Sequence, residues 1–161
     1  MNICMLIEAW KPLWGGGQEH VLQLCKRLSQ RGHTVDLYVM NLGDGLPLKE
    51  KLFDNVTLHR IGDPCTFTFA SRLAWCKKVA RINGQYDIIH AHANLPGLPA
   101  KKLSVRLGIP VVYTVHGSGL DALQDMYGWK GRLLYYVERY LHCRIKYDAQ
   151  ITVDSSFLRQ H

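Results

Sequence analysis

His90 and His92 stand two residues apart at the end of the apolar segment Asp87–His92. In a β-strand the side chains alternate between the two faces of the sheet, so both imidazoles would share one face. A histidine pair at this spacing can bind a metal ion. However, no Asp, Glu or Cys with suitable ligand spacing accompanies the pair, and a buried, hydrogen-bonded histidine is the more common case. We predict no metal site and keep both histidines as candidates for a ligand cleft.

His116 is the strongest single candidate for a catalytic residue. It ends the predicted strand Val111–His116 and precedes Gly117 and Ser118, small residues that let a ligand approach the backbone closely. Imidazole changes its charge near neutral pH and can donate or accept a proton there. The alternative is a structural histidine that caps the strand end. A loop of small residues favours a ring that faces the cleft.

Three glycines, Gly15 to Gly17, follow the first apolar segment and precede a predicted helix. The free N–H groups and the positive dipole end of a helix N-terminus suit a diphosphate, a sulfate or a carboxylate. The spacing matches neither the dinucleotide motif G-x-G-x-x-G nor a P-loop, since no Lys-Ser/Thr pair follows. Phosphate binding and a flexible turn are both open at this point.

A predicted helix over Trp129–Tyr147 concentrates positive charge. Arg132, Arg139 and Lys146 recur every seven residues on one side of it, with tyrosines near them. A solvated basic face is one interpretation, and contact with an anionic membrane surface is the other. Nucleic acid is disfavoured as a partner, because the sequence has no recognisable nucleic-acid-binding module.

Strands and helices alternate along the chain. Apolar runs predict strands over Asn2–Glu8, Thr34–Met40, Val56–Ile61, Asp87–His92, Val111–His116 and Ala149–Val153. Helical spacing predicts helices from the three glycines to Gly32 and over Phe69–Ile82, Leu98–Leu107 and Trp129–Tyr147, with a loop over Asn41–Asp54. Apolar strands joined by helices are typical of a parallel sheet covered on both faces. We therefore predict a single α/β domain, a Rossmann-like doubly wound parallel sheet, whose ligands bind beyond the carboxyl ends of the strands.

Composition and charge narrow the class of protein. With 47% hydrophobic and 20% charged residues, the 161-residue chain is typical of a globular domain. No apolar run approaches the ~20 residues that span a membrane. Five scattered cysteines without a Cys-x-x-Cys pair predict free, buried thiols. The first residues include no basic leader, and we expect a cytoplasmic protein. The net charge of +7 permits a phosphate, a lipid surface or a nucleic acid as partner and does not choose among them.

Four segments carry a family resemblance: GGGQEHV at 15–21, LSQRGHTV at 28–35, YDIIHAH at 86–92 and TVHGS at 114–118. In this order and at this spacing they resemble the family-4 glycosyltransferases, with a likeness from Met1 to about Phe157. More narrowly, the chain resembles the N-terminal, acceptor-side domain of these GT-B enzymes. The resemblance implies transfer of a sugar from a nucleotide diphosphate sugar to an acceptor glycan or lipid, with retention of anomeric configuration.

The resemblance also implies roles for the candidate residues. Gly16 and Gly17 match the glycine loop that approaches the donor diphosphate. His116 matches the histidine that contacts the donor sugar near the reacting carbon, and Gly117 and Ser118 belong to the same donor-binding motif. The family needs no bound metal, so we expect a nucleotide sugar as substrate and no cofactor.

Two acidic residues have no assigned role. Glu19 matches a motif position in the cleft whose role stays open. The family often has Asp directly after His-Gly-Ser, whereas here Gly119 and Leu120 precede Asp121. Acceptor specificity is expected to depend on loops such as Asn41–Asp54 and Asp63–Thr68.

In this family a second Rossmann-like domain binds the nucleotide and neutralises the leaving diphosphate, and its motifs are not among these residues. We therefore expect half of a GT-B enzyme, without its C-terminal donor-binding domain and inactive alone. A Rossmann oxidoreductase is disfavoured, because Gly15–Gly17 lack the dinucleotide spacing and Asp36 lies inside a strand. A non-catalytic basic module, peripheral to an anionic membrane, is the third hypothesis.

Overall fold

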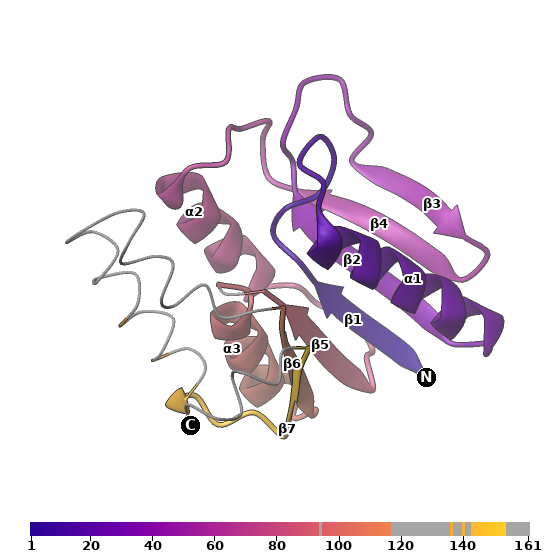
Figure 1. The fold of residues 1–161 in the computed structure, drawn as a ribbon, viewed down its shortest axis with the longest axis vertical. Coiled ribbons are helices and arrows are strands. Elements are labelled where there is room, and N and C mark those ends of the chain that lie inside the picture. Colours follow the sequence, from indigo (N-terminus) through magenta and orange to yellow (C-terminus); the bar gives the residue numbers. More distant parts are fainter. Residues whose placement is uncertain (94, 117–135, 137–139, 141–142, 154–161) are drawn as a thin grey trace.

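The computed structural model describes residues 1–93, 95–116, 136, 140 and 143–153. These residues form a seven-stranded sheet with helices packed on it (Figure 1). The strands are β1 (Asn2–Leu6), β2 (Thr34–Met40), β3 (Lys49–Phe53), β4 (Val56–Ile61), β5 (Ile88–His92), β6 (Val111–Val115) and β7 (Ala149–Thr152). The helices described are α1 (Gly16–Gln30), α2 (Phe69–Val79) and α3 (Gly97–Leu107). The predicted Rossmann-like α/β fold is confirmed.

The strand order is β3-β4-β2-β1-β5-β6-β7, and every neighbouring pair is parallel except β3 with β4. From β1 the chain builds outward through β2 and β4, and it then returns to place β5 on the other side of β1. This reversal is the switch point of a doubly wound sheet. Ligands of such sheets bind in the crevice outside the carboxyl ends of the strands at that point.

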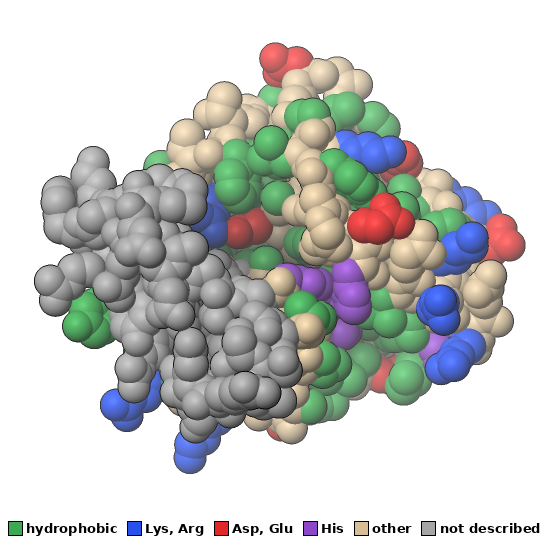
Figure 2. All heavy atoms as spheres, viewed as in Figure 1, with side chains coloured by type: hydrophobic (Ala, Val, Ile, Leu, Met, Phe, Trp, Pro, Cys, Tyr) green, Lys and Arg blue, Asp and Glu red, His purple; other side chains and the backbone are tan. Residues whose placement is uncertain are grey.

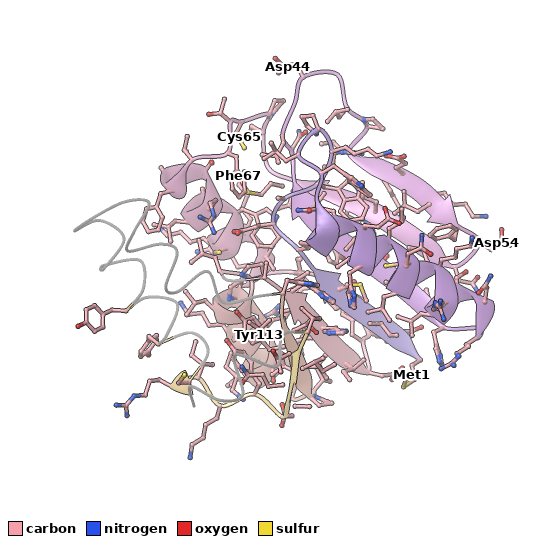
Figure 3. All side chains as sticks on the ribbon, in the orientation of Figure 1. Met1, Asp44, Asp54, Cys65, Phe67 and Tyr113 are labelled. Carbon is pink, nitrogen blue, oxygen red and sulfur yellow. The ribbon has the colours of Figure 1, made fainter. Side chains whose placement is uncertain are left out.

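The two edges of the sheet can be followed in Figure 3. Asp44, Cys65 and Phe67, which lie in the loops after β2 and β4, are found at one edge of the molecule. Met1 and Asp54, which precede β1 and β4, lie toward the opposite edge. The first edge is therefore the carboxyl edge, where a ligand site is expected.

Two apolar clusters cover the two faces of the sheet. On one face, Met5 and Leu37 pack with Val21 of α1. On the other face, Trp75 of α2 and Leu103 of α3 belong to the second cluster. Because both faces of the central strands are covered, their buried runs are continuous, and this is the pattern from which the sequence predicted a parallel sheet.

Glycines end two of the helices. Gly32 has a φ of +79°, and its N–H bonds to the Ser29 carbonyl just after α1. Gly108 is the C-cap of α3 with a φ of 69°. Positive φ favours glycine because the residue has no Cβ. The predicted ends of these two helices are confirmed.

Several predicted elements have different bounds in the structure, and the first strand, predicted over Asn2–Glu8, ends at Leu6. The predicted loop Asn41–Asp54 contains β3, which pairs antiparallel with β4 at the sheet edge. Its Lys-Glu-Lys start has no apolar run, so only pairing with β4 reveals the strand. The predicted helix Phe69–Ile82 ends at Val79, where turn hydrogen bonds such as Ile82 N–H to the Val79 carbonyl replace the helical ones.

Most of the predicted basic helix Trp129–Tyr147, including Arg132 and Arg139, lies outside the described residues. Cys143 is helical, and a turn follows at Arg144. Lys146 therefore lies beyond the helix, and the predicted extension to Tyr147 is wrong. The predicted seven-residue repeat of basic side chains loses its third member.

Candidate functional site

Four histidines meet on the α1 face of the sheet at its carboxyl edge. His90 and His92 come from β5, His116 follows β6, and His20 lies near the start of α1. The ring centroids are 4.1 Å apart for His90 and His92, 5.2 Å for His92 and His116, and 5.0 Å for His20 and His116. Figure 2 shows histidine side chains gathered near the centre of the face in view. We call these four residues the histidine cluster.

The register of β5 and β6 explains the contacts in this cluster. His92 of β5 stands opposite Thr114 of β6. Because side chains two residues apart share a face, His92 has His90 beside it on β5 and His116 beside it just after the end of β6. His90 Nε2 lies 2.8 Å from Thr114 Oγ1, and His92 Nδ1 lies 3.0 Å from His116 Nε2. The expectation that His90 and His92 share one face is confirmed, and each has a hydrogen-bond partner.

Burial keeps most of this cluster uncharged. His92 is 0% exposed, and burial holds its pKa well below the ordinary value. Burial, together with the neighbouring histidines, also lowers the pKa of His90 and of His116 to about 4. These three imidazoles are therefore neutral at pH 7. Each can donate one hydrogen bond and accept another, and none supplies a positive charge.

Helix α1 begins against the ring of His116. Its N-cap is Gly15, and no side chain caps the helix, so the N–H groups of the first turn have no side-chain partner. A Cβ added to Gly17 would lie 3.7 Å from His116 Cγ, whereas one added to Gly16 would meet nothing within 4 Å. The positive end of the helix dipole thus lies beside the histidine cluster.

The other predicted site residues fall outside these contacts. Glu19 lies in the first turn of α1, where its exposed carboxylate accepts a hydrogen bond of 2.9 Å from Gln23. Gly117, Ser118 and Asp121 lie outside the described residues. The structure therefore brings together Gly16, Gly17, His90, His92 and His116.

His20 was missed by the sequence prediction. It lies three residues after Gly17, a spacing that places both on one side of a helix. Its ring meets that of His116 nearly edge-on, at an interplanar angle of 73°. The spacing was a usable signal, but the contact itself depends on how α1 packs on the sheet.

A buried ion pair at the carboxyl edge was also missed. Glu8, just after β1, is 5% exposed, and its carboxylate accepts hydrogen bonds of 3.0 and 2.5 Å from Arg72 of α2. Burial raises the pKa of Glu8, and Arg72 partly offsets that rise. The guanidinium also lies 5.0 Å from the ring centroid of Phe67. The pair holds the loop after β1 against α2 at the carboxyl ends of the strands.

Within the part of the chain that the structure describes, no three His, Cys, Asp or Glu side chains are arranged to hold a metal ion. In the histidine cluster, ring nitrogens of His92 and His116 face each other at hydrogen-bond distance. The neutral imidazoles of His90, His92 and His116 can form hydrogen bonds here, beside the N-terminus of α1.

A family model, Glycosyltransferase Family 4, matches residues 14–161. The chain belongs to glycosyltransferase family 4. The match includes the start of α1 and all four members of the histidine cluster. The predicted resemblance is confirmed, and membership in this family sets aside the oxidoreductase hypothesis.

Similar proteins of this family are several times longer than the matched region. A D-inositol 3-phosphate glycosyltransferase from Acidothermus cellulolyticus is 32% identical over 116 residues, which cover 63% of this chain and 25% of that protein. A mannosylfructose-phosphate synthase from Agrobacterium fabrum is 30% identical over 124 residues, which cover 70% of this chain and 27% of that protein. The matched region thus spans about a quarter of these glycosyltransferases.

The fold also matches a solved structure. Sucrose-phosphate synthase from Thermosynechococcus elongatus superimposes with a TM-score of 0.78 at 17% identity, covering 99% of this chain and 44% of that one. At this identity the likeness concerns the fold, which is that of an N-terminal, Rossmann-like GT-B domain.

Among the described residues, no helix combines the length and hydropathy needed to span a bilayer.

Proposed function

We propose that this family-4 domain supplies the acceptor side of an enzyme that transfers a sugar from a nucleotide diphosphate sugar with retention. The acceptor is a glycan or a lipid. One observation carries the proposal: the neutral ring of His116 packs against Gly17 at the uncapped start of α1. A diphosphate bound by the free N–H groups of α1 would place its attached sugar beside His116.

The proposed roles follow from size and charge. Gly16 and Gly17 let the donor diphosphate approach the backbone. His116, with Gly117 and Ser118, contacts the donor sugar. Because His116 is neutral at pH 7, it suits a sugar hydroxyl better than the departing diphosphate. The charge of the leaving group therefore needs other partners, namely the dipole of α1 and basic residues of a second, nucleotide-binding domain.

The acceptor is proposed to bind between two loops at the carboxyl edge. A pocket of about 360 Å³ is lined by Leu42, Gly43, Asp44, Pro64, Cys65 and Thr66. These residues come from the loops after β2 and β4, which are the segments expected to vary with the acceptor. The buried Glu8–Arg72 pair holds α2, which follows the second loop, to the sheet.

The test compares the chain alone with the same chain joined to a donor-binding half. We expect no sugar transfer from UDP- or GDP-sugars by residues 1–161 alone, because one domain supplies only part of the cleft. A fusion to the remaining part of the Agrobacterium fabrum relative should transfer sugar to a member of an acceptor panel. The panel contains glycans, lipid-linked sugars and D-inositol 3-phosphate. The last compound is included because the Acidothermus cellulolyticus relative is a D-inositol 3-phosphate glycosyltransferase. Transfer by the isolated chain would contradict the need for a second domain.

A further inference from the structure

We propose that His92 is a positioning residue for His116. The buried imidazole of His92 donates its Nδ1–H to Nε2 of His116. This hydrogen bond holds His116 in the tautomer that carries the ring proton on Nδ1 of His116. The inference rests on the proposed contact between His116 and the donor sugar. The two nitrogens are 3.0 Å apart. The ring planes are inclined by only 28° and the ring centroids are 5.2 Å apart, so the two nitrogens face each other edge to edge.

Burial decides which histidine donates. His92 is 0% exposed, and its Nε2 has no hydrogen-bond partner among the described residues. If His116 donated, the proton of His92 would sit on Nε2 as a buried N–H without an acceptor, which is a costly arrangement. If His92 donates, only a lone pair stays unmatched there. The proton of His116 then lies on Nδ1, in a ring that is only half buried.

The resulting donor faces the proposed donor-sugar site. His116 Nδ1 would lie 4.0 Å from a Cβ placed on Gly17, so this side of the ring borders the first turn of α1. An Nδ1–H group there can donate to a hydroxyl oxygen of a bound sugar. Rotation of the ring by 180° would break the bond with His92. His92 therefore selects both the tautomer and the orientation of the ring.

The surrounding backbone keeps His92 in place. Ala93, the next residue, has a φ of +65°, which is unusual for a residue other than glycine. Its N–H bonds to the Thr114 carbonyl at 3.2 Å, so the end of β5 is attached to β6. Nε2 of His90 lies at hydrogen-bond distance from Thr114 Oγ1, so this nitrogen is not available to replace His92 as the partner of His116.

The first experiment uses the 161-residue chain labelled with ¹⁵N in its histidines. Imidazole ¹⁵N–¹H correlation spectra report the tautomer of each ring, and coupling across the hydrogen bond identifies donor and acceptor. We expect the shared proton on Nδ1 of His92 and an unprotonated Nε2 in His116. A proton on Nε2 of His116 would overturn the proposal. This measurement needs no substrate and no activity, so it stands even if the proposed sugar transfer is wrong.

The second experiment separates positioning from structural support. In the active fusion, His92→Leu removes the donor, whereas His92→Asn keeps an amide N–H at the place of Nδ1. We expect a tenfold or greater loss of turnover in His92→Leu and recovery to within about threefold of wild type in His92→Asn. Ile89→Val, on the opposite face of β5, is the control for lost stability. We expect it to lower the melting temperature about as much as His92→Leu does and to leave turnover normal.

A double-mutant cycle completes the test. If His92 acts through His116, His92→Leu should cause no further loss of turnover in a His116→Gln background, because the group it positions is already gone. Equal losses of turnover in both backgrounds would show that His92 acts independently of His116 and would overturn the proposal.

Discussion

At the scale of the residue, His116 makes two contacts: a hydrogen bond to His92 and packing against Gly17. The first contact complicates the usual alanine substitution. Truncation would leave the buried Nδ1 of His92 without its partner, at about 1–3 kcal/mol. Loss of activity and loss of stability would then occur together, and an alanine variant could not distinguish a substrate contact from a structural one.

Glutamine separates the two effects, because its side-chain amide can reach the position of Nε2 and accept the hydrogen bond from His92. We expect His116→Gln in the active fusion to keep a melting temperature close to wild type and to lose tenfold or more in turnover. That loss corresponds to ~1.4 kcal/mol of transition-state stabilisation. His116→Ala should lower both quantities. Near-normal turnover in His116→Gln would show that the ring does not contact the donor.

At the scale of the element, the first turn of α1 contains two glycines where alanine would make a more stable helix. Gly16 and Gly17 are helical, and added Cβ atoms would meet nothing or only ordinary contacts. Alanine is a better helix former than glycine. Packing in this domain therefore does not require the two glycines, and the proposed approach of the donor diphosphate to the backbone would give them a use.

Gly17→Ala should stabilise the isolated chain by about 0.5 kcal/mol and weaken use of the donor in the active fusion. The measurements are urea unfolding of the chain and KM for the nucleotide sugar. Gly97→Ala is the matched control, because it is also in the first turn of a helix but its Cβ would collide with Tyr147 and Tyr113. We expect that control to be destabilised. An unchanged KM in Gly17→Ala would contradict a close approach of the diphosphate.

The basic segment Trp129–Tyr147 supports a separate prediction from its sequence. We expect weak, salt-sensitive binding of the chain to anionic vesicles, at about 1 kcal/mol per basic residue near the surface. Replacement of Arg132 and Arg139 by glutamate should abolish co-sedimentation at low salt. A double variant that co-sediments like the wild type would indicate that these arginines form a solvated or packed face.

At the scale of the whole molecule, the buried histidines couple stability to pH. Folding lowers the pKa of His90, His92 and His116, so between their folded values and the ordinary 6.5 the unfolded chain binds more protons. Stability is then highest above pH 6.5 and falls as the pH drops toward 4. For His90 alone the loss at pH 5 is about 2 kcal/mol.

Two carboxylates have shifted pKa values, and only Glu8 changes stability in this pH range. Glu8 acts in the opposite direction, because its raised pKa makes the folded chain the better proton acceptor above pH 4.5. Asp36, whose pKa is lowered mainly by its hydrogen bond to His59, contributes only below its ordinary value of 3.8. Urea unfolding at pH 7.5, 6 and 5 checks the prediction, with His90→Asn expected to show a shallower slope. A free energy of unfolding that is constant over this range would contradict it.

The sequence alone determined the types and order of most elements and the family. Thr34–Met40 and Val56–Ile61 form strands with the predicted bounds, because their periodicity and β-forming side chains are local properties. The shared face of His90 and His92 follows from the two-residue repeat of a strand. His116 was selected as a site residue because it ends a strand of a parallel sheet, where ligands bind.

Only the tertiary structure decided the partners of these residues. The bond between His92 and His116 depends on the register of β5 with β6, and the contact of His20 depends on the packing of α1. Glu8 and Arg72 are 64 positions apart, and β3 exists through its pairing with β4. Local patterns encode the period and the ends of an element. They do not encode which distant side chain will lie opposite, because that is determined by how the whole sheet and its helices pack together.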